Sequence, residues 1–320
     1  MSRLTQEAHG AYAPPVPALE LIAHSADGAR LHVEVHGPED APAVVLAHGW
    51  TCSTAFWAAQ IRDLAADHRV VAYDQRGHGR SPASDACSTE ALADDLEAVL
   101  AATLAPGEKA VLVGHSMGGM TLMAASARPR FREHAAAALL CSTGSTGLVA
   151  EARVLPLRAG PFRTRVTQAV LGSRAPLGPV TPVAKRILKY ATMGPGSSPV
   201  MVAACARIVH ACPRTVRHAW SAVLATLDLE HSVRELRVPT AVIAGTVDRL
   251  TPVVHARALV AGLPNCVGST ELPGVGHMTP VEAPELVSAR IRELVSTYTQ
   301  TAEAPTAGEG LAGAEIKEGA

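Results

Sequence analysis

Aromatic residues, cysteine motifs and long apolar runs are all scarce in this chain of 320 residues. Phe, Trp and Tyr together make up only 3% of it. None of the six cysteines has a partner at C-x-x-C spacing, which argues against a metal cluster and against a disulfide framework. No stretch is long and apolar enough to cross a bilayer. We therefore expect neither a metal nor a cofactor.

An excess of charge of one sign is lacking too. The chain has 28 Lys and Arg against 29 Asp and Glu, a formal net charge of -1 at pH 7, and no sustained basic run. This balance gives no indication of nucleic-acid binding or of a stable association with a membrane. The first 17 residues lack a basic segment followed by an apolar one, so no secretory signal is visible. We expect a cytoplasmic protein.

What the chain does contain is hydrophobic residues, 48% in all, in alternating strand-like and helix-like patterns. Short apolar runs predict strands at 19–24, 31–35, 43–47, 70–73, 110–113, 137–141, 240–244 and 267–272. Helical spacing predicts helices at 54–64, 90–104, 120–127, 252–263 and 281–298. Alternation of apolar strands with helices is typical of an α/β fold, a mostly parallel central sheet flanked by helices.

The hydrophobic rhythm changes between residues 143 and 231. No strand pattern occurs there, and Gly and Pro breaks separate helix-like pieces at 162–171, 182–191, 199–211 and 213–227. We predict a helical cap at 143–231, inserted into an α/β core formed by 18–142 and 232–300. Residues 1–17 and 301–320 have the composition of disordered segments. Apolar cap residues, Phe162, Val170 and Ile187 among them, are candidates for the roof of an apolar pocket.

A G-x-S-x-G pattern lies at the centre of the chain, from Gly114 to Gly118, directly after a buried strand and before a helix of small residues. A turn from strand straight into helix leaves no room for side chains at the two glycines. It presents Ser116 at a helix N-terminus, whose free N–H groups favour negative charge. The pattern in this context predicts a nucleophile elbow.

A serine nucleophile needs a base, and the base needs a carboxylate that fixes its tautomer. His277 follows the last predicted strand within a glycine-rich loop, at the sheet edge that also carries the elbow. Asp248 follows the strand before it, and Thr251 is expected to cap the next helix. His68 and His255 are expected on surface helices or loops. Catalytic roles are therefore predicted for Ser116, Asp248 and His277.

Acyl transfer also needs N–H donors for a developing oxyanion. The backbone of Met117, next to the serine, is one candidate. The second is the backbone of Trp50, in the His48-Gly49-Trp50 loop that follows the strand at 43–47.

The order Ser116, Asp248, His277, with His48-Gly49 upstream and the loop 74–81 between, resembles the α/β-hydrolase family over roughly 19–298. The resemblance implies an α/β-hydrolase fold with a helical cap and serine-dependent cleavage of a carboxylic ester or lactone through an acyl-enzyme. It implies a structural role for the loop 74–81. The aliphatic side chains of the cap predict a small to medium apolar substrate. His-Gly-Trp replaces the His-Gly-Gly-Gly of one esterase branch, and a serine elbow disfavours dehalogenases and epoxide hydrolases.

Other uses of the same site stay open. Similar proteins employ this triad for C–C bond hydrolysis, acyl transfer or cofactor-free perhydrolysis, and some members of the family are small-molecule receptors. Fold alone does not decide among these functions.

Overall fold

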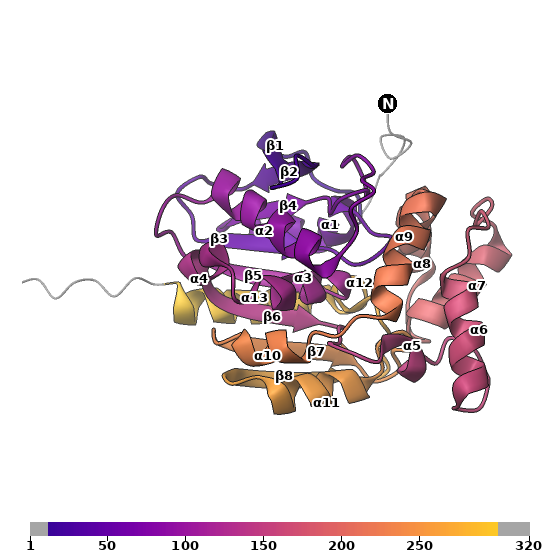
Figure 1. Ribbon diagram of the computed structural model, residues 1–320. Coiled ribbons are helices and arrows are strands. Elements are labelled where there is room, and N and C mark those ends of the chain that lie inside the picture. The colour runs from indigo at the N-terminus through magenta and orange to yellow at the C-terminus, as the bar shows by residue number, and fades with distance from the viewer. Residues whose placement is uncertain (1–11, 300–320) are drawn as a thin grey trace, which may run out of the picture.

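The computed structural model describes residues 12–299 (Figure 1). The expectation for 301–320, and most of that for 1–17, falls outside the described residues.

One eight-stranded sheet runs through the molecule, in the order β1-β2-β4-β3-β5-β6-β7-β8. β1 pairs antiparallel with β2 and β2 antiparallel with β4, whereas all later pairs are parallel. The strands are Leu19–His24, Arg30–His36, Ala43–Ala47, Arg69–Tyr73, Ala110–His115, Ala135–Cys141, Thr240–Gly245 and Cys266–Leu272. The α/β fold and its mostly parallel sheet are confirmed.

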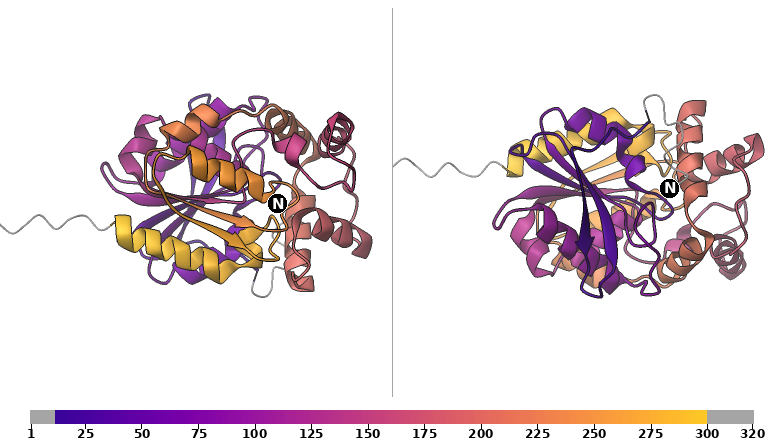
Figure 2. Two further views of the ribbon diagram at one scale, coloured as in Figure 1. Left: turned by 90° about the horizontal axis from the view of Figure 1, so that it is seen from below. Right: turned by 90° about the horizontal axis from the view of Figure 1, so that it is seen from above.

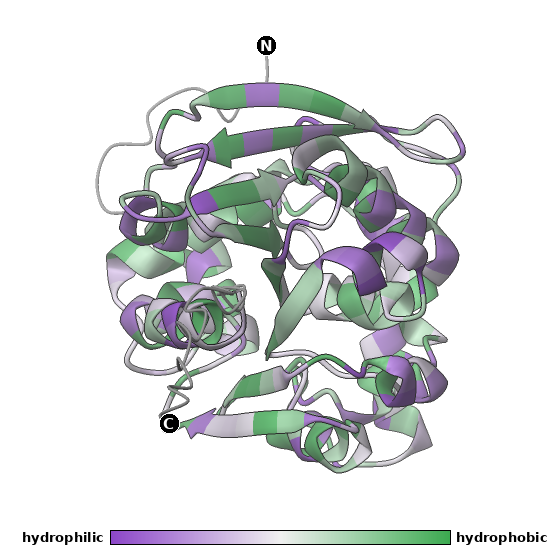
Figure 3. Cartoon of the chain, turned by 90° about the vertical axis from the view of Figure 1, so that its left-hand side faces the viewer, coloured by the Kyte–Doolittle hydropathy of each residue, from purple (hydrophilic) through white to green (hydrophobic). Residues whose placement is uncertain are grey.

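Alternate residues of the central strands enter two separate cores. On β5, Leu112 packs into one hydrophobic cluster while Val111 and Val113 pack into the other. This follows from the two-residue period of a strand, and it explains why the central strands are apolar along their length. The outer strands β1 and β2 carry hydrophilic bands instead (Figure 3).

Helices cover both faces of the sheet (Figure 2). The core helices are α1 (Ala58–Leu64), α2 (Thr89–Thr103), α3 (Met117–Ala125), α4 (Pro129–His134), α10 (Glu230–Glu235), α11 (Val253–Gly262), α12 (Thr279–Glu282) and α13 (Pro284–Tyr298). Two expected helices differ. The first opens with a 3-10 turn, η2 (Thr54–Trp57), and the last is two helices because the chain bends at Ala283 before Pro284. The short helices α4 and α10 have too few residues for a detectable period.

Between β6 and β7 the chain forms a helical segment beyond the carboxyl ends of the parallel strands (Figure 1). Before α10 it comprises α5 (Leu148–Glu151), α6 (Pro161–Leu171), α7 (Pro182–Thr192), α8 (Pro199–Ala211) and α9 (Arg214–Ala225). An isolated bridge joins Thr146 to Asp228 at its base. We call residues 143–231 the cap. Among the described helices, cap included, none is long and apolar enough to cross a membrane.

Candidate active site

Strand β5 ends in a strained turn at Ser116, which has φ 51° and ψ -117°. A Cβ on Gly114 would overlap the carbonyl of Gly118, and a Cβ on Gly118 would overlap the carbonyl of Ala47 on the neighbouring strand. Only glycine fits at either position, so the strand can pass directly into α3. Between residues 110 and 123, Ser116 is the one residue that is not buried. The turn therefore leaves this serine accessible.

Asp248 and His277 are joined by a hydrogen bond of 2.8 Å, from Nδ1 of the imidazole to Oδ2 of the carboxylate. Both residues are buried. The carboxylate also accepts from the backbone N–H groups of Leu250 (2.8 Å) and Thr251 (2.9 Å) and from the Thr251 hydroxyl (2.9 Å). Four donors fix it in place, and a donated Nδ1–H leaves Nε2 of His277 free to act as a base.

The sequence predicted that Thr251 caps the following helix, but in the structure it does not. Helix α11 begins at Val253 after Pro252, with no side-chain cap. The Thr251 hydroxyl instead lies between Oδ2 of Asp248 and the carbonyl oxygen of Ser142, which it contacts at 2.9 Å. The predicted role of Thr251 as a helix N-cap is therefore wrong, because its hydroxyl orients the Asp248 carboxylate instead.

The backbone of His277 is held beside the elbow. Nε2 of His115, the residue before Ser116, donates to the His277 carbonyl oxygen at 2.9 Å. The His277 N–H donates to the carbonyl oxygen of Thr192 in the cap at 2.8 Å. Ser116 Oγ makes no hydrogen bond to His277 within the part of the chain that the structure describes. Such bonds are often long in unliganded enzymes and tighten with substrate.

Glu282 is a residue of this site that the sequence analysis missed. One carboxylate oxygen accepts from the N–H of Gly194 (2.6 Å), the hydroxyl of Ser197 (2.7 Å) and the N–H of Gly276 (3.2 Å). The other accepts from the N–H of Met278 at 3.1 Å. It thereby ties both neighbours of His277 to the cap. The signal available was a carboxylate five positions after the histidine, inside a four-residue helix.

Two N–H groups near Ser116 are available as donors. Met117 is the first residue of α3, so its N–H has no partner inside the helix. The N–H of Trp50 has no acceptor among residues 12–299. A Cβ on Gly49, next to Trp50, would lie 3.1 Å from Cβ of Ser116, so this loop passes directly against the serine.

Buried side chains hold that loop in position. Nε2 of His48 accepts from the N–H of Gln75 at 3.0 Å, and the Gln75 amide spans from the His48 carbonyl to Thr121 on α3. Burial and the nearby His78 lower the pKa of His48 to about 3, although its bond to the Gly49 carbonyl favours the proton. His48 is therefore a neutral structural group at pH 7.

The loop 74–81 has bonds suited to a structural role. The Asp74 carboxylate accepts from the N–H groups of Thr54 and Arg80, each at 2.8 Å. Burial raises its pKa to about 6, against the lowering effect of these two bonds. The loop also anchors the cap, since the Trp220 indole donates to the Arg76 carbonyl at 3.2 Å.

Two histidines lie elsewhere than expected. His68 and His255 are 7% and 6% exposed, so both are buried rather than on the surface. A Cβ on Gly144 would meet the ring of His255 at 2.8 Å, which shows how closely the cap's first residues cover it.

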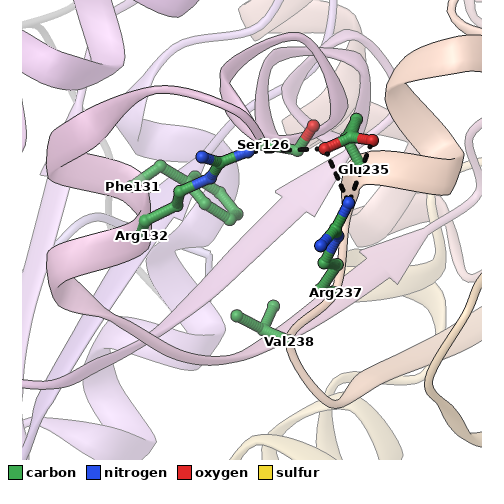
Figure 4. Close-up of a pocket in the computed structure, with 6 residues that line it drawn as sticks. All are labelled: Ser126, Phe131, Arg132, Glu235, Arg237 and Val238. Atoms are coloured by element: carbon green, nitrogen blue, oxygen red, sulfur yellow. Dashed lines mark hydrogen bonds and ion pairs between the residues drawn. The ribbon is translucent and has the colours of Figure 1, made fainter.

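A surface pocket lies at the other end of the sheet, near the amino ends of β6 and β7 (Figure 4). Arg132 and Arg237 both reach Glu235 there, at 3.4 and 3.3 Å. The pocket's lining holds no base beside a nucleophile. The groups suited to catalysis therefore lie at the carboxyl edge and not here.

One group of side chains among the described residues has metal-ligand spacing: Glu20, His32 and Glu34, on β1 and β2. Arg80 already lies within it, 2.7 Å from Glu20 and 3.3 Å from Nε2 of His32. A guanidinium in this position opposes a second cation, so we assign the group to an ion-pair network.

Comparisons with known proteins agree with this fold. Residues 44–290 match the model of the Alpha/beta hydrolase family. The chain is 28% identical over 273 residues to the pimeloyl-[acyl-carrier protein] methyl ester esterase of Xylella fastidiosa, covering 83% of this chain and 99% of the esterase. It is 38% identical to 3-oxoadipate enol-lactonase 1 of Acinetobacter baylyi, over 30% of this chain and 35% of the lactonase. That local match spans about a third of the lactonase's length.

A solved structure is similar over most of the chain. The esterase RhEst1 from Rhodococcus sp. ECU1013 superposes with a TM-score of 0.72 at 26% identity, covering 87% of this chain and 99% of the esterase. Relatives of this kind support ester or lactone hydrolysis in general. The family match extends over residues 44–290, which is more than half of this chain. The chain therefore belongs to the alpha/beta hydrolase family.

Proposed function

We propose that this protein is a serine hydrolase that cleaves a carboxylic ester or lactone through an acyl-enzyme. The observation that carries the proposal is the buried 2.8 Å bond between Asp248 and His277, whose carbonyl is bonded to the residue before Ser116. A base with a fixed tautomer, held beside an accessible serine, is the arrangement that activates a hydroxyl.

In this mechanism Ser116 Oγ attacks the carbonyl carbon while Nε2 of His277 takes the hydroxyl proton. The N–H groups of Met117 and Trp50 stabilise the resulting oxyanion. His277 then gives the proton to the alcohol oxygen as its bond to the carbonyl carbon breaks, which leaves the acyl group on Ser116. The alcohol of an ester departs, whereas that of a lactone stays attached to the acyl chain. A water molecule, deprotonated by His277, then attacks the acyl carbon, the bond to Ser116 Oγ breaks as His277 returns the proton to Oγ, and the acid is released.

The proposed substrates are small to medium apolar esters or lactones. The cap contributes apolar side chains next to the site, since Met193 follows Thr192, whose carbonyl binds the His277 N–H, and Met193 and Val202 are both buried. Apolar lining with a few placed polar groups is typical of ligand sites. Each buried methylene should lower the free energy of the bound transition state by up to about 0.8 kcal/mol, and so raise kcat/KM, until the pocket is full.

The test is turnover of p-nitrophenyl esters from acetate to dodecanoate, beside a charged succinyl ester. We expect a burst of one p-nitrophenol per Ser116, a rise in kcat/KM with chain length, and a poor succinyl ester. A flat profile would contradict the apolar preference. Failure to turn over any ester or lactone would contradict the acyl-enzyme mechanism.

Product analysis separates this function from the other uses of such a site. Hydrolysis releases acid and alcohol in equal amounts from an ester, and a single hydroxy acid from a lactone. Acyl transfer gives a new ester, perhydrolysis needs peroxide and gives a peracid, C–C hydrolysis needs a ketone-type substrate, and a receptor binds without turnover.

A further inference from the structure

Charge is divided unequally between the cap and the rest of the chain. Residues 152–227 contain eleven Lys and Arg and no Asp or Glu. Since the whole chain has a formal net charge of -1, the remainder must carry -12. Within residues 12–299, none of the eleven cap cations lies within ion-pair distance of a carboxylate. The near-neutral total conceals a strongly basic segment: the whole cap, 143–231, contains the same eleven cations with three acids, Glu151, Asp228 and Glu230, a net charge of +8 against -9 for the rest of the chain, which we call the body.

Helix α6 (Pro161–Leu171) presents its apolar side chains outward. Its two buried residues are polar, Arg163 and Thr167. Phe162 is 71% exposed and Val170 is 51% exposed. A helix that packs on a core buries its apolar face, so this orientation is the reverse of the usual one. It also corrects the expectation that Phe162 and Val170 roof a pocket, because both side chains face solvent.

Helix α7 (Pro182–Thr192) repeats the pattern. Val183 is 62% exposed, Ile187 64% and Tyr190 43%, at a spacing of four and three residues that places them along one side of the helix. Thr192 is its one buried residue. The exposed position of Ile187 again contradicts a role in a pocket roof. Lys185, Arg186 and Lys189 lie between these apolar residues.

Helices α6 and α7 lie at the end of the molecule remote from the amino ends of the strands (Figures 1 and 2). We call their exposed faces, within residues 161–192, the outer cap surface. Large exposed apolar side chains on a monomer commonly mark an interaction site. Basic residues interleaved with exposed apolar ones are typical of helices that lie in the plane of a lipid interface.

We propose that the outer cap surface binds an anionic lipid surface. Phe162, Val183 and Ile187 would enter the boundary between headgroups and acyl chains, while the surrounding Arg and Lys side chains contact lipid phosphates. A second copy of the chain is a poor occupant, because two caps with a net charge of +8 each would repel one another. An acidic protein would satisfy the charge but gives no specific reason for so many bare aliphatic side chains.

This binding is independent of the proposed function, since it is measured without turnover. The expectation of no stable membrane association rests on the whole-chain charge and does not take the charge separation into account. The protein has no described membrane-spanning helix, so binding at the surface, reversible by salt, is the form expected.

The experiment is flotation of the full chain with vesicles of phosphatidylcholine alone or mixed with phosphatidylglycerol. We expect binding to the anionic vesicles only, with loss on raising NaCl from 50 to 500 mM. The variant Phe162→Ser/Ile187→Ser and the variant Arg165→Glu/Arg186→Glu should each weaken binding by about tenfold or more. All four residues are exposed, so folding is preserved and is checked by circular dichroism.

Matched controls lie on the body of the molecule. Leu286→Ser/Val254→Ser removes two exposed apolar side chains, 57% and 45% exposed, and Arg132→Glu/Arg237→Glu makes the same change in net charge as the cap variant. Both controls should bind as the wild type does. Equal loss in the controls would overturn the proposal by showing a nonspecific charge effect. Absence of flotation at 50 mM NaCl, or binding to an acidic polypeptide but not to vesicles, would overturn it as well.

Discussion

At the scale of single residues, Asp248 is defined by the four donors around it. Its oxygens accept from His277, two backbone N–H groups and the Thr251 hydroxyl. These four donors occupy the lone pairs of the carboxylate, so water does not compete with His277 for it. A carboxylate constrained in this way holds the His277 imidazole in one orientation. That constraint is the physical reason to expect His277 to act as a base through Nε2.

Replacement of Asp248 by Asn should therefore lower kcat by about 10⁴-fold, because an amide can favour the wrong imidazole tautomer. Circular dichroism should show a folded protein. The control is Asp74→Asn, whose carboxylate bonds the N–H groups of Thr54 and Arg80 and makes no bond to His277. It should keep most of its turnover. If Asp74→Asn were folded but inactive while Asp248→Asn stayed active, Asp74 would be the carboxylate needed for catalysis and Asp248 would be structural.

Glu282 acts on the same histidine through its neighbours. Glu282→Gln keeps the size of the side chain, but its amide N–H₂ must face either the N–H of Met278 or the donors of Gly194, Ser197 and Gly276, so one of these sets loses its acceptor. We expect kcat to fall by about 10²-fold, since a small displacement of a catalytic base has costs of that order. The matched control is Glu285→Gln, exposed on α13. If Glu282→Gln lowered Tm and left kcat unchanged, the carboxylate would be structural only.

At the scale of elements, the elbow depends on how closely β5, α3 and β3 approach. Gly118→Ala should destabilise the protein by about 1–3 kcal/mol and abolish turnover, because the new methyl would overlap the Ala47 carbonyl. Gly196→Ala, where a Cβ would meet nothing within 4 Å, should change the free energy of unfolding by less than about 0.5 kcal/mol. Urea denaturation of both variants measures the difference, and equal effects would refute the packing argument.

The same closeness explains what the sequence could and could not predict. Apolar runs such as 43–47 and the G-x-S-x-G turn report local requirements, so the strands and the elbow were predictable. The bond from His115 to the His277 carbonyl, and the clamp at Glu282, join residues far apart in the chain and leave no local pattern. Thr251 was misassigned for a similar reason, since a hydroxyl before proline is equally suited to a helix cap and to a carboxylate partner.

At the scale of the whole molecule, neutral histidines around the elbow make the fold sensitive to acid. Burial lowers the pKa of His48 to about 3 and that of His78 to about 4. Burial also lowers the pKa of His115, with a further contribution from His277. In the unfolded chain these groups protonate near pH 6.5. Below that pH the unfolded state binds more protons than the folded one, so stability falls as pH falls toward 4.

Each of these histidines should cost up to about 1.4 kcal/mol per pH unit between pH 6 and 4, and Asp74, whose pKa is raised to about 6, offsets the contribution of one of them. Urea denaturation at pH 7.5 and 5.5 should therefore show a clear loss of stability at the lower pH. His48→Gln, which can still accept from Gln75 and donate to Gly49, should reduce that loss. His24→Gln, at an exposed position on β1, should leave it unchanged. A pH-independent free energy of unfolding would show that the buried rings are not neutral.

The whole chain also shows why average composition misleads. A net charge of -1 indicated no anionic partner, yet the positive charge gathers in the cap while the negative charge lies in the body. Only the arrangement of the helices shows which of the cap's apolar residues face solvent. The cap's outward face was therefore beyond the reach of composition.

The most direct test of the central claim is the turnover of Ser116→Ala with a p-nitrophenyl ester, measured beside labelling of the wild type by a fluorophosphonate. Alanine fits the elbow, so the variant should fold, lose about 10⁴-fold or more of kcat and take up no label. In the wild type a single label should map to Ser116. A folded Ser116→Ala that keeps most of its turnover, or a label on another residue, would contradict a serine acyl-enzyme.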